Sequence, residues 1–294
     1  MVSLPMCYND AMAFPLLLLF FVLGAIVGSF LNVAVFRHGV RALSGRSLCF
    51  SCGKTLRSFE LVPIVSFFAQ GRRCRSCKSR LSWQYPLVEL LTGLVFALVF
   101  HKHLSFDLSG LSTNYYLLAI DLLLWSLLIA LSVYDLRHKI IPNLFVYGFL
   151  LLSFLSFLTK SSQLQAISSL DFFGGLLLAS PFALLWFLSR GRAIGLGDAK
   201  LMLGFPWFVG FAKAVSAVVV GFWLGAAVAL VLLLLKAVSA SLPRGFSPNL
   251  NATLKGLTMK TELPLAPFLV LGLFIVYLTG IDVTGLGQLL AVSF

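Results

Sequence analysis

Charged residues are scarce in this sequence. Only 11% of its 294 residues are Asp, Glu, Lys or Arg, whereas 60% are hydrophobic, and its mean hydropathy is +1.00. Soluble domains carry about 25% charged and roughly 45–50% apolar residues. An apolar excess of this size does not fit inside one soluble core. The composition therefore excludes an ordinary soluble protein and a disordered chain.

Acidic residues are the rarer of the two charged classes. The chain has 10 Asp and Glu against 22 Lys and Arg, which gives a formal net charge of +12. In a chain this apolar, we interpret the basic excess as a signal of membrane topology, because basic residues gather in the cytosolic loops of membrane proteins. We expect a lipid bilayer and no nucleic acid as a partner.

Long apolar runs are frequent, and a membrane-spanning helix needs about 20 mostly apolar residues. We predict an all-α polytopic membrane protein with about eight transmembrane helices. The segment 201–212 is the weakest span because it is short and contains Pro206, so a re-entrant segment is the alternative there. The predicted spans cover residues 14–36, 85–100, 115–134, 140–158, 172–188, 201–212, 214–235 and 264–279.

The distribution of basic residues gives an orientation. With eight crossings and the amino terminus outside, 19 of the 22 Lys and Arg residues fall in loops on one side. The positive-inside rule assigns that side to the cytosol. If the segment 201–212 did not cross, the last basic loop would face outward and the bias would weaken.

Four of the five cysteines lie in the cytosolic insertion 37–84, as two Cys-x-x-Cys pairs separated by 21 residues: Cys49 and Cys52, then Cys74 and Cys77. Two such pairs favour a structural Zn²⁺ held by four thiolates. Free thiols, a disulfide and a redox pair are the alternatives. The cytosolic location disfavours stable disulfides, although Cys-x-x-Cys also occurs in redox proteins.

Acidic residues inside membrane spans are functional candidates because their burial is unfavourable. Asp121 and Asp171 lie near the starts of their spans, where a helix-terminal role is the simpler interpretation. Glu89 lies about one turn into the second span, where it either pairs with a loop Arg or points into a cavity. Asp135 and Asp198 both lie at cytosolic ends of spans and so share a depth.

Asp198 follows two glycines, Gly195 and Gly197, which leave room beside its carboxylate for another backbone. Two adjacent carboxylates share a proton and titrate as a pair. This is the arrangement of aspartic proteases, in which one carboxylate activates water and the other protonates the leaving amine. The alternative is that each Asp is an independent helix cap or the partner of a nearby Arg.

Several motifs occur in a fixed order along the chain, and their combination resembles the type IV prepilin peptidases of bacteria. They include Gly28-Ser29-Phe30-Leu31-Asn32, the two cysteine pairs, Tyr85-Pro86-Leu87-Val88-Glu89-Leu90-Leu91-Thr92-Gly93, Ile141-Pro142-Asn143, Gly195-Leu196-Gly197-Asp198-Ala199-Lys200 and Leu263-Pro264-Leu265-Ala266-Pro267. The chain departs from the family pattern at Leu61-Val62 and at Ala266, which concerns substrate preference.

The resemblance implies that Asp135 and Asp198 are the catalytic pair of an aspartic endopeptidase. Its substrates would be precursors of type IV pilins or of type II secretion pseudopilins, cut on the cytosolic side of the bacterial inner membrane. The resemblance also implies N-methylation of the new amino terminus with S-adenosylmethionine. We expect the acids Glu60, Glu89 and Glu262 to receive the basic leader of the substrate.

These interpretations give three parts: a first transmembrane helix (1–36), a four-cysteine zinc-binding domain (37–84) and a multi-helix transmembrane peptidase domain (85–294). One rival is an intramembrane protease like presenilin or signal-peptide peptidase, which also pairs Tyr-Asp with Gly-x-Gly-Asp. The four-cysteine insertion argues against it. The other rival is a thiol-redox or transport membrane protein, in which the acids relay protons.

Overall fold

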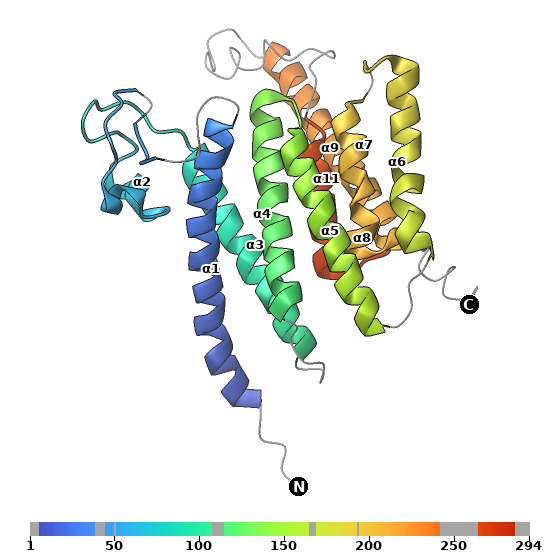
Figure 1. The fold of residues 1–294 in the computed structure, drawn as a ribbon. Coiled ribbons are helices and arrows are strands. Elements are labelled where there is room, and N and C mark those ends of the chain that lie inside the picture. Colours follow the sequence, from blue (N-terminus) through green and yellow to red (C-terminus); the bar gives the residue numbers. More distant parts are fainter. Residues whose placement is uncertain are drawn as a thin grey trace. The chain divides into compact units, whose positions relative to one another are not determined.

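The protein is built from helices (Figure 1). A computed structural model describes residues 6–38, 45–49, 51–107, 115–164, 169–192, 194–241 and 264–285. Within these ranges there is no β-strand, only two isolated bridges, so the predicted all-α class is confirmed. The helices are α1 (Met6–Arg37), the 3-10 helix η1 (Ser58–Leu61), α2 (Val65–Ala69), α3 (Gln84–Asp107), α4 (Tyr115–His138), α5 (Asn143–Leu164), α6 (Ser169–Ser189), α7 (Leu196–Leu203), α8 (Phe205–Val209), α9 (Phe211–Ser241) and α11 (Ala266–Thr279).

Six of the described helices are long and apolar enough to cross a membrane, and they match six of the predicted spans. They are Ala13–Arg37, Gln84–Leu104, Tyr115–His138, Asn143–Lys160, Ser169–Ser189 and Phe211–Val238. The predicted span 264–279 corresponds to α11, which has 14 residues. A helix of that length rises about 21 Å, less than the roughly 30 Å of a hydrocarbon core. The six long apolar helices make the chain a multi-pass membrane protein.

The predicted span 201–212 is not one helix. It contains the end of α7, all of α8 and the start of α9. Pro206 lies in the first turn of α8, where a helix accepts proline. Gly210 ends α8 with φ 87°, a left-handed conformation that glycine adopts without a steric penalty. The orientation derived from eight crossings stays a prediction.

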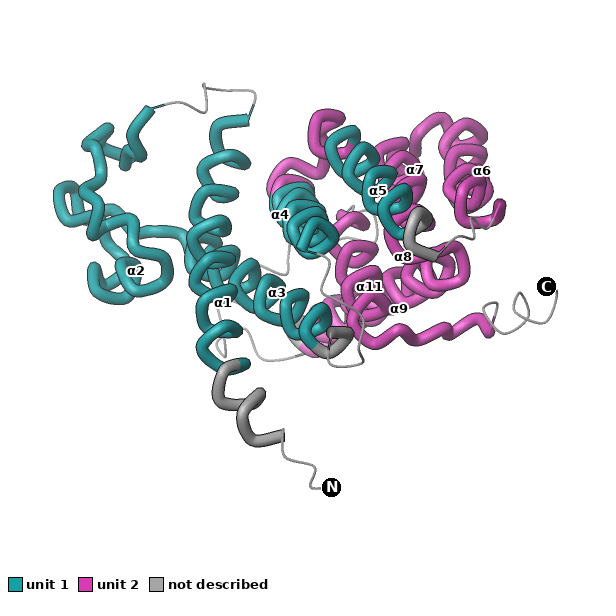
Figure 2. The backbone as a smooth tube through the Cα atoms, turned by 60° about the horizontal axis from the view of Figure 1, so that its bottom comes forward, with its two compact units in different colours: residues 1–133, 147–160 teal, residues 134–146, 161–294 magenta. Residues whose placement is uncertain are grey.

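The chain forms two compact units (Figure 2). Unit 1 comprises residues 1–133 and 147–160, and unit 2 comprises residues 134–146 and 161–294. The division runs through α4 and α5, so it differs in kind from the predicted limits at residues 36 and 84. Those domain limits stay a prediction.

In unit 1, α1 packs against α3 through glycines. A Cβ atom on Gly24 would lie 2.6 Å from the carbonyl oxygen of Thr92. A Cβ atom on Gly28 would lie 2.9 Å from the Cα of Glu89. Small residues spaced four apart let two membrane helices approach closely, and the resulting van der Waals contact replaces the hydrophobic driving force that lipid does not provide.

In unit 2, glycines allow the same close approach between α9 and α11. A side chain on Gly272 would overlap the carbonyl oxygen of Ala217, and one on Gly221 would lie 2.9 Å from the Cα of Leu269. A side chain on Gly175 of α6 would overlap the carbonyl oxygen of Leu203, at the end of α7. Two of the helix contacts in unit 2, that of α9 with α11 and that of α6 with α7, thus depend on the absence of a Cβ atom.

Two of the acids in predicted spans have structural partners. Asp121 in unit 1 is 2% exposed, and its carboxylate lies 3.0 Å from Nε2 of His103. Since Asp121 lies beyond the first turn of α4, the interpretation as a first-turn acid is wrong. In unit 2, Asp171 accepts a hydrogen bond of 2.7 Å from the backbone N–H of Phe211, so it caps α9 from α6.

The close contact of α1 with α3 at Gly24 predicts that alanine is unfavourable there, whereas alanine should be favourable at a glycine outside this contact. Gly24→Ala should destabilise the protein by about 1–3 kcal/mol, because the new methyl group meets a backbone carbonyl. Gly148→Ala in α5 is the matched control, since its methyl group would meet only the tip of Leu127 and alanine favours the helix by roughly 1 kcal/mol. Thermal unfolding in detergent measures both, and equal stability of the two variants would contradict the packing.

Candidate active site and metal centre

Asp135 and Asp198 belong to unit 2, where they lie in the last turn of α4 and the first turn of α7. Both are buried, with exposed fractions of 5% and 8%. Burial and, to a lesser degree, the charge of Asp135 raise the pKa of Asp198 to about 7. The charge of Asp135 therefore acts on the carboxyl group of Asp198, so the two acids lie within electrostatic range of each other.

Helix starts supply hydrogen bonds to both carboxylates. The backbone N–H of Gly195 donates to Asp198, and the backbone N–H of Ala266 donates to Asp135. Ala266 is the first residue of α11, after Leu265 as its N-cap, so its N–H has no partner within the helix. The contact of Ala266 with Asp135 was not foreseen from the sequence. Only the Pro267 that follows, at a position that favours a helix start, hinted at a helix terminus there.

The two glycines before Asp198 do different things. A Cβ atom on Gly195 would lie 3.3 Å from Oδ2 of Asp198. One on Gly197 would lie 2.8 Å from the Cβ of Ile141, in the Ile-Pro-Asn stretch after α4. The room expected beside Gly197 is thus filled by Ile141, whereas Gly195 borders the carboxylate itself. The close approach to Ile141 fixes where α7 begins.

Lys200 does not neutralise Asp198. Its Nζ donates a hydrogen bond of 3.2 Å to Oδ1 of Asn143 at the start of α5. This is consistent with the helical geometry, because residues two apart point about 200° away from each other. The raised pKa of Asp198 is therefore not offset by the neighbouring lysine.

The four cysteines of the insertion come together in unit 1. Their sulfur atoms all lie within 4.8 Å of one another, and Sγ of Cys49 lies 3.8 Å from Sγ of Cys77. Cys49 and Cys74 are buried, whereas Cys52 and Cys77 are exposed. A compact set of four thiols is able to hold a metal ion, and this part of the sequence prediction is confirmed.

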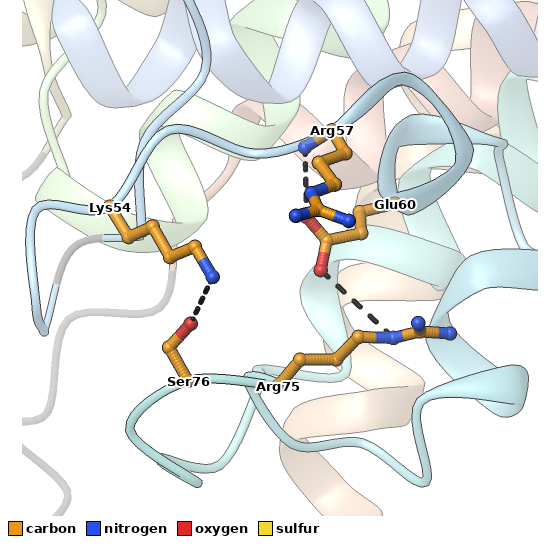
Figure 3. Close-up of polar contacts among 5 residues, drawn as sticks. All are labelled: Lys54, Arg57, Glu60, Arg75 and Ser76. Carbon is orange, nitrogen blue, oxygen red and sulfur yellow. Dashed lines mark hydrogen bonds and ion pairs between the residues drawn. The ribbon is translucent and has the colours of Figure 1, made fainter.

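Both cysteine pairs lie on turns with the same hydrogen bonds. In each turn the N–H of the first cysteine donates to the carbonyl five residues later, and its carbonyl accepts from the N–H four residues later. The partners are Lys54 and Gly53 for Cys49, and Ser79 and Lys78 for Cys74. Lys54 also donates from Nζ to Oγ of Ser76 at 2.7 Å, which joins the two turns (Figure 3). Each of the two turns thus contributes two sulfur atoms to the same cluster.

Ser79 favours the thiolate form of one cysteine in the cluster. The hydroxyl of Ser79 lies 3.1 Å from Sγ of Cys77, and hydrogen bonds from Ser79 lower the pKa of Cys77 to about 6. The thiolate that these hydrogen bonds favour is the form that binds metal ions.

Glu60 and Glu89 have partners within unit 1. Oε2 of Glu60 accepts a hydrogen bond of 2.8 Å from the N–H of Arg57, and Oε1 lies 4.0 Å from Nε of Arg75 (Figure 3). Glu89 is buried and accepts a hydrogen bond of 2.7 Å from the N–H of Ile64. Glu89 thus binds the backbone of the insertion. The sequence had suggested a loop Arg or a cavity as its surroundings, and neither interpretation named this contact.

The role of these acids in receiving a substrate stays a prediction. Glu262, the third acid expected to receive the leader, lies outside the described residues.

Comparison with known proteins relates both sites to one group of enzymes. Residues 22–103 match the family model of the bacterial peptidase A24 N-terminal domain, and residues 122–239 match that of the type IV leader peptidase family. The chain is 31% identical over 272 residues to a prepilin leader peptidase/N-methyltransferase of Bacillus subtilis, which covers 90% of this chain and 95% of the relative. The chain belongs to the type IV leader peptidase family.

Other members of the family are similar over most of their length. A prepilin leader peptidase/N-methyltransferase of Pseudomonas aeruginosa is 30% identical over 259 residues, 78% of this chain and 84% of the relative. A type 4 prepilin-like proteins leader peptide-processing enzyme of Escherichia coli is 31% identical over 212 residues, 64% of this chain and 74% of the relative. No solved structure matches the chain.

The two family models divide the candidate sites between them. The N-terminal family model spans the four cysteines, and the type IV leader peptidase model spans Asp135 and Asp198. Ala266 lies beyond both, although its N–H donates to Asp135.

The cysteine cluster predicts a metal-dependent change in thiol reactivity. Four of the five cysteines belong to the cluster, so, if it holds a metal ion, four more thiols should react with a thiol reagent after metal removal than before it. Titration of denatured and native protein with and without a strong chelator measures this. Five reactive thiols in the untreated native protein would argue against a bound metal, and thiols that appear only after reduction would indicate disulfides.

Proposed function

We propose that this chain is a membrane aspartic endopeptidase that removes the leader peptide from prepilins, with Asp135 and Asp198 as its catalytic pair. The observation that carries the proposal is the burial of two mutually interacting carboxyl groups, each held by a helix-terminal N–H. The names of three relatives at 30–31% identity, which refer to prepilin or leader peptide processing, support the same reaction.

The mechanism follows from one proton shared by two carboxyl groups. Asp198 holds the proton because burial and the neighbouring carboxylate raise its pKa. Asp135 accepts a proton from the attacking water as the water oxygen bonds to the scissile carbonyl carbon. Asp198 polarises the carbonyl oxygen and protonates the leaving amine as the C–N bond breaks. Transfer of the proton from Asp135 to Asp198 restores the starting state.

The proposed substrates are precursors of type IV pilins or type II secretion pseudopilins with short basic leaders. In the proposed orientation, the two acids and the cysteine insertion face the cytosol of a bacterium and the helices span its inner membrane. The concentration of 19 of the 22 basic residues on one side of the predicted topology supports this orientation. A basic leader is held on that same side by the same rule.

A second activity, N-methylation of the new amino terminus, belongs to the proposal because two relatives carry N-methyltransferase in their names. S-adenosylmethionine, when bound, would supply the methyl group. The described residues do not single out a site for this cofactor, so no step of methylation is assigned to particular side chains.

We further propose that the cysteine cluster holds a structural Zn²⁺. With Zn–S bonds of about 2.3 Å, the sulfurs of a tetrahedral site lie about 3.8 Å apart. The Cys49–Cys77 distance of 3.8 Å fits this geometry. Four protein ligands leave no open position, so the ion would fix the fold of the insertion and take no part in hydrolysis. One tightly bound zinc per chain and no redox-active disulfide would exclude the thiol-redox alternative.

Substitution of either acid should separate the two proposed activities. Asp135→Asn and Asp198→Asn should each lower cleavage of a prepilin peptide by roughly 10²–10⁴-fold or more, because an amide neither accepts nor donates the required proton. Methylation of a pre-cleaved peptide should be largely retained. Mass spectrometry of both products measures these outcomes.

Asp171→Asn provides a matched control, because an amide oxygen still accepts the hydrogen bond from Phe211. This variant should cleave at nearly the rate of the unmodified protein. Normal cleavage by either Asp135→Asn or Asp198→Asn would refute the catalytic pair.

The raised pKa of Asp198 predicts the alkaline side of the pH profile. Since the reaction needs one proton on the pair, and the pKa of Asp198 is about 7, kcat/KM should fall as the pH rises through 7. Loss of a single proton gives a fall of about tenfold per pH unit above that point. An initial-rate profile in detergent measures it, with methylation of pre-cleaved peptide as the reference. A cleavage rate that keeps rising between pH 7 and 9 would exclude this role of Asp198.

A further inference from the structure

The cysteine insertion carries an exposed apolar face. It is formed by large side chains from η1 and the residue after it, from α2 and from the residue before α3, each between 40% and 63% exposed: Phe59, Leu61, Val62, Val65, Phe68 and Trp83. We call these six residues the insertion face. None of them lies in one of the six membrane-spanning segments. Large apolar side chains that gather at an exposed surface usually mark a contact with a membrane or another molecule.

The insertion face is tied to the end of a membrane span. Trp83 directly precedes Gln84, where α3 begins. The ring of Trp83 lies 5.2 Å from that of Phe67 and 6.3 Å from that of Phe68, so α2 packs on the residue before α3. Figure 1 shows α2 at the level of the last turns of α1. The first turns of a span lie at the headgroup layer, where tryptophan is enriched.

A hydrogen bond also ties the segment before α2 to α3. The N–H of Ile64, which precedes α2, donates to the carboxylate of Glu89 five residues into α3. Ile64 has φ 62°, a conformation that is unfavourable for a β-branched residue and persists only where its surroundings hold it. The bond to buried Glu89 is such a constraint. The orientation of α2 beside the start of α3 is therefore set by packing inside unit 1.

The charges around the insertion face match an anionic surface. Arg72 lies 4.5 Å above the ring of Trp83, and Arg75 lies 4.8 Å above that of Phe59. Between residues 45 and 83 the chain has eight Lys and Arg and one acid, Glu60. Apolar side chains surrounded by basic ones bind the interface of anionic membranes, with about 1 kcal/mol from each basic residue near the surface.

We propose that the insertion face lies in the headgroup layer beside the start of α3 and binds anionic phospholipid there. In this position Val65 and Phe68 reach the upper acyl chains, while Arg72 and Arg75 extend to lipid phosphates. The insertion is then anchored to the bilayer surface as well as joined to α1 and α3. A basic leader peptide fits this face less well, because the surrounding arginines repel it.

Photo-crosslinking of the full-length protein tests the proposal. p-Benzoylphenylalanine replaces Phe68 in one variant, Val65 in a second and Thr55 in a third, where Thr55 is an exposed residue of the first cysteine turn. The proteins are reconstituted into phosphatidylcholine vesicles with or without phosphatidylglycerol. Mass spectrometry identifies the adducts, and the metal content of each variant checks that the cysteine cluster is intact.

We expect several-fold more lipid adducts at positions 65 and 68 than at position 55. Phosphatidylglycerol should be enriched among them relative to its share of the vesicles. Arg72→Gln together with Arg75→Gln should remove this enrichment and leave the phosphatidylcholine adducts. Equal lipid adducts at all three positions would overturn the proposal. So would replacement of the lipid adducts at position 68 by peptide adducts when a prepilin peptide is added, because the face would then be a peptide-binding surface.

Discussion

Two carboxyl groups buried side by side repel each other when both are ionised, and unit 2 is organised around holding them in place. The burial of Asp198 and the charge of Asp135 raise the pKa of Asp198 to about 7. Backbone N–H groups at the starts of α7 and α11 act in the opposite sense, since they stabilise negative charge. Burial and the neighbouring charge thus favour the protonated form of Asp198, whereas the helix-terminal N–H groups favour the ionised form of both acids.

Close packing of the surrounding helices positions the segments that carry and contact the two acids. Gly197 lets α7 approach Ile141, and Gly175 lets α6 approach the end of α7. Gly272 brings α11 against α9, and the first N–H of α11 reaches Asp135. In a membrane, where burial of apolar surface between helices gains little, such close backbone contacts supply much of the association energy. A larger side chain at any of these glycines would meet the backbone or side chain of the neighbouring segment.

The cysteine insertion obeys a different constraint. It is too small to form a hydrophobic core of its own, so turns, a thiol cluster and neighbouring helices have to hold it. Two turns with the same hydrogen bonds direct four sulfurs to one point, and Glu89 of α3 anchors the segment before α2. These contacts leave apolar side chains of α2 and Trp83 exposed beside the start of α3. The insertion is thus coupled to α3 through both a polar and an aromatic contact.

The sequence by itself determined the all-helical membrane fold and the cysteine cluster, and it singled out Asp135 and Asp198 as the candidate pair. Composition and apolar runs indicate whether a chain folds in water or in lipid. Cys-x-x-Cys spacing is typical of a local turn. Neither signal depends on contacts between distant residues. The tertiary structure decided the rest. The break of 201–212 into α7 and α8, the pairing of Asp121 with His103, the bond from Ile64 to Glu89 and the donation from Ala266 to Asp135 all join or depend on residues whose proximity arises from helix packing. No local pattern encodes such contacts, because each depends on where a second helix is placed in three dimensions.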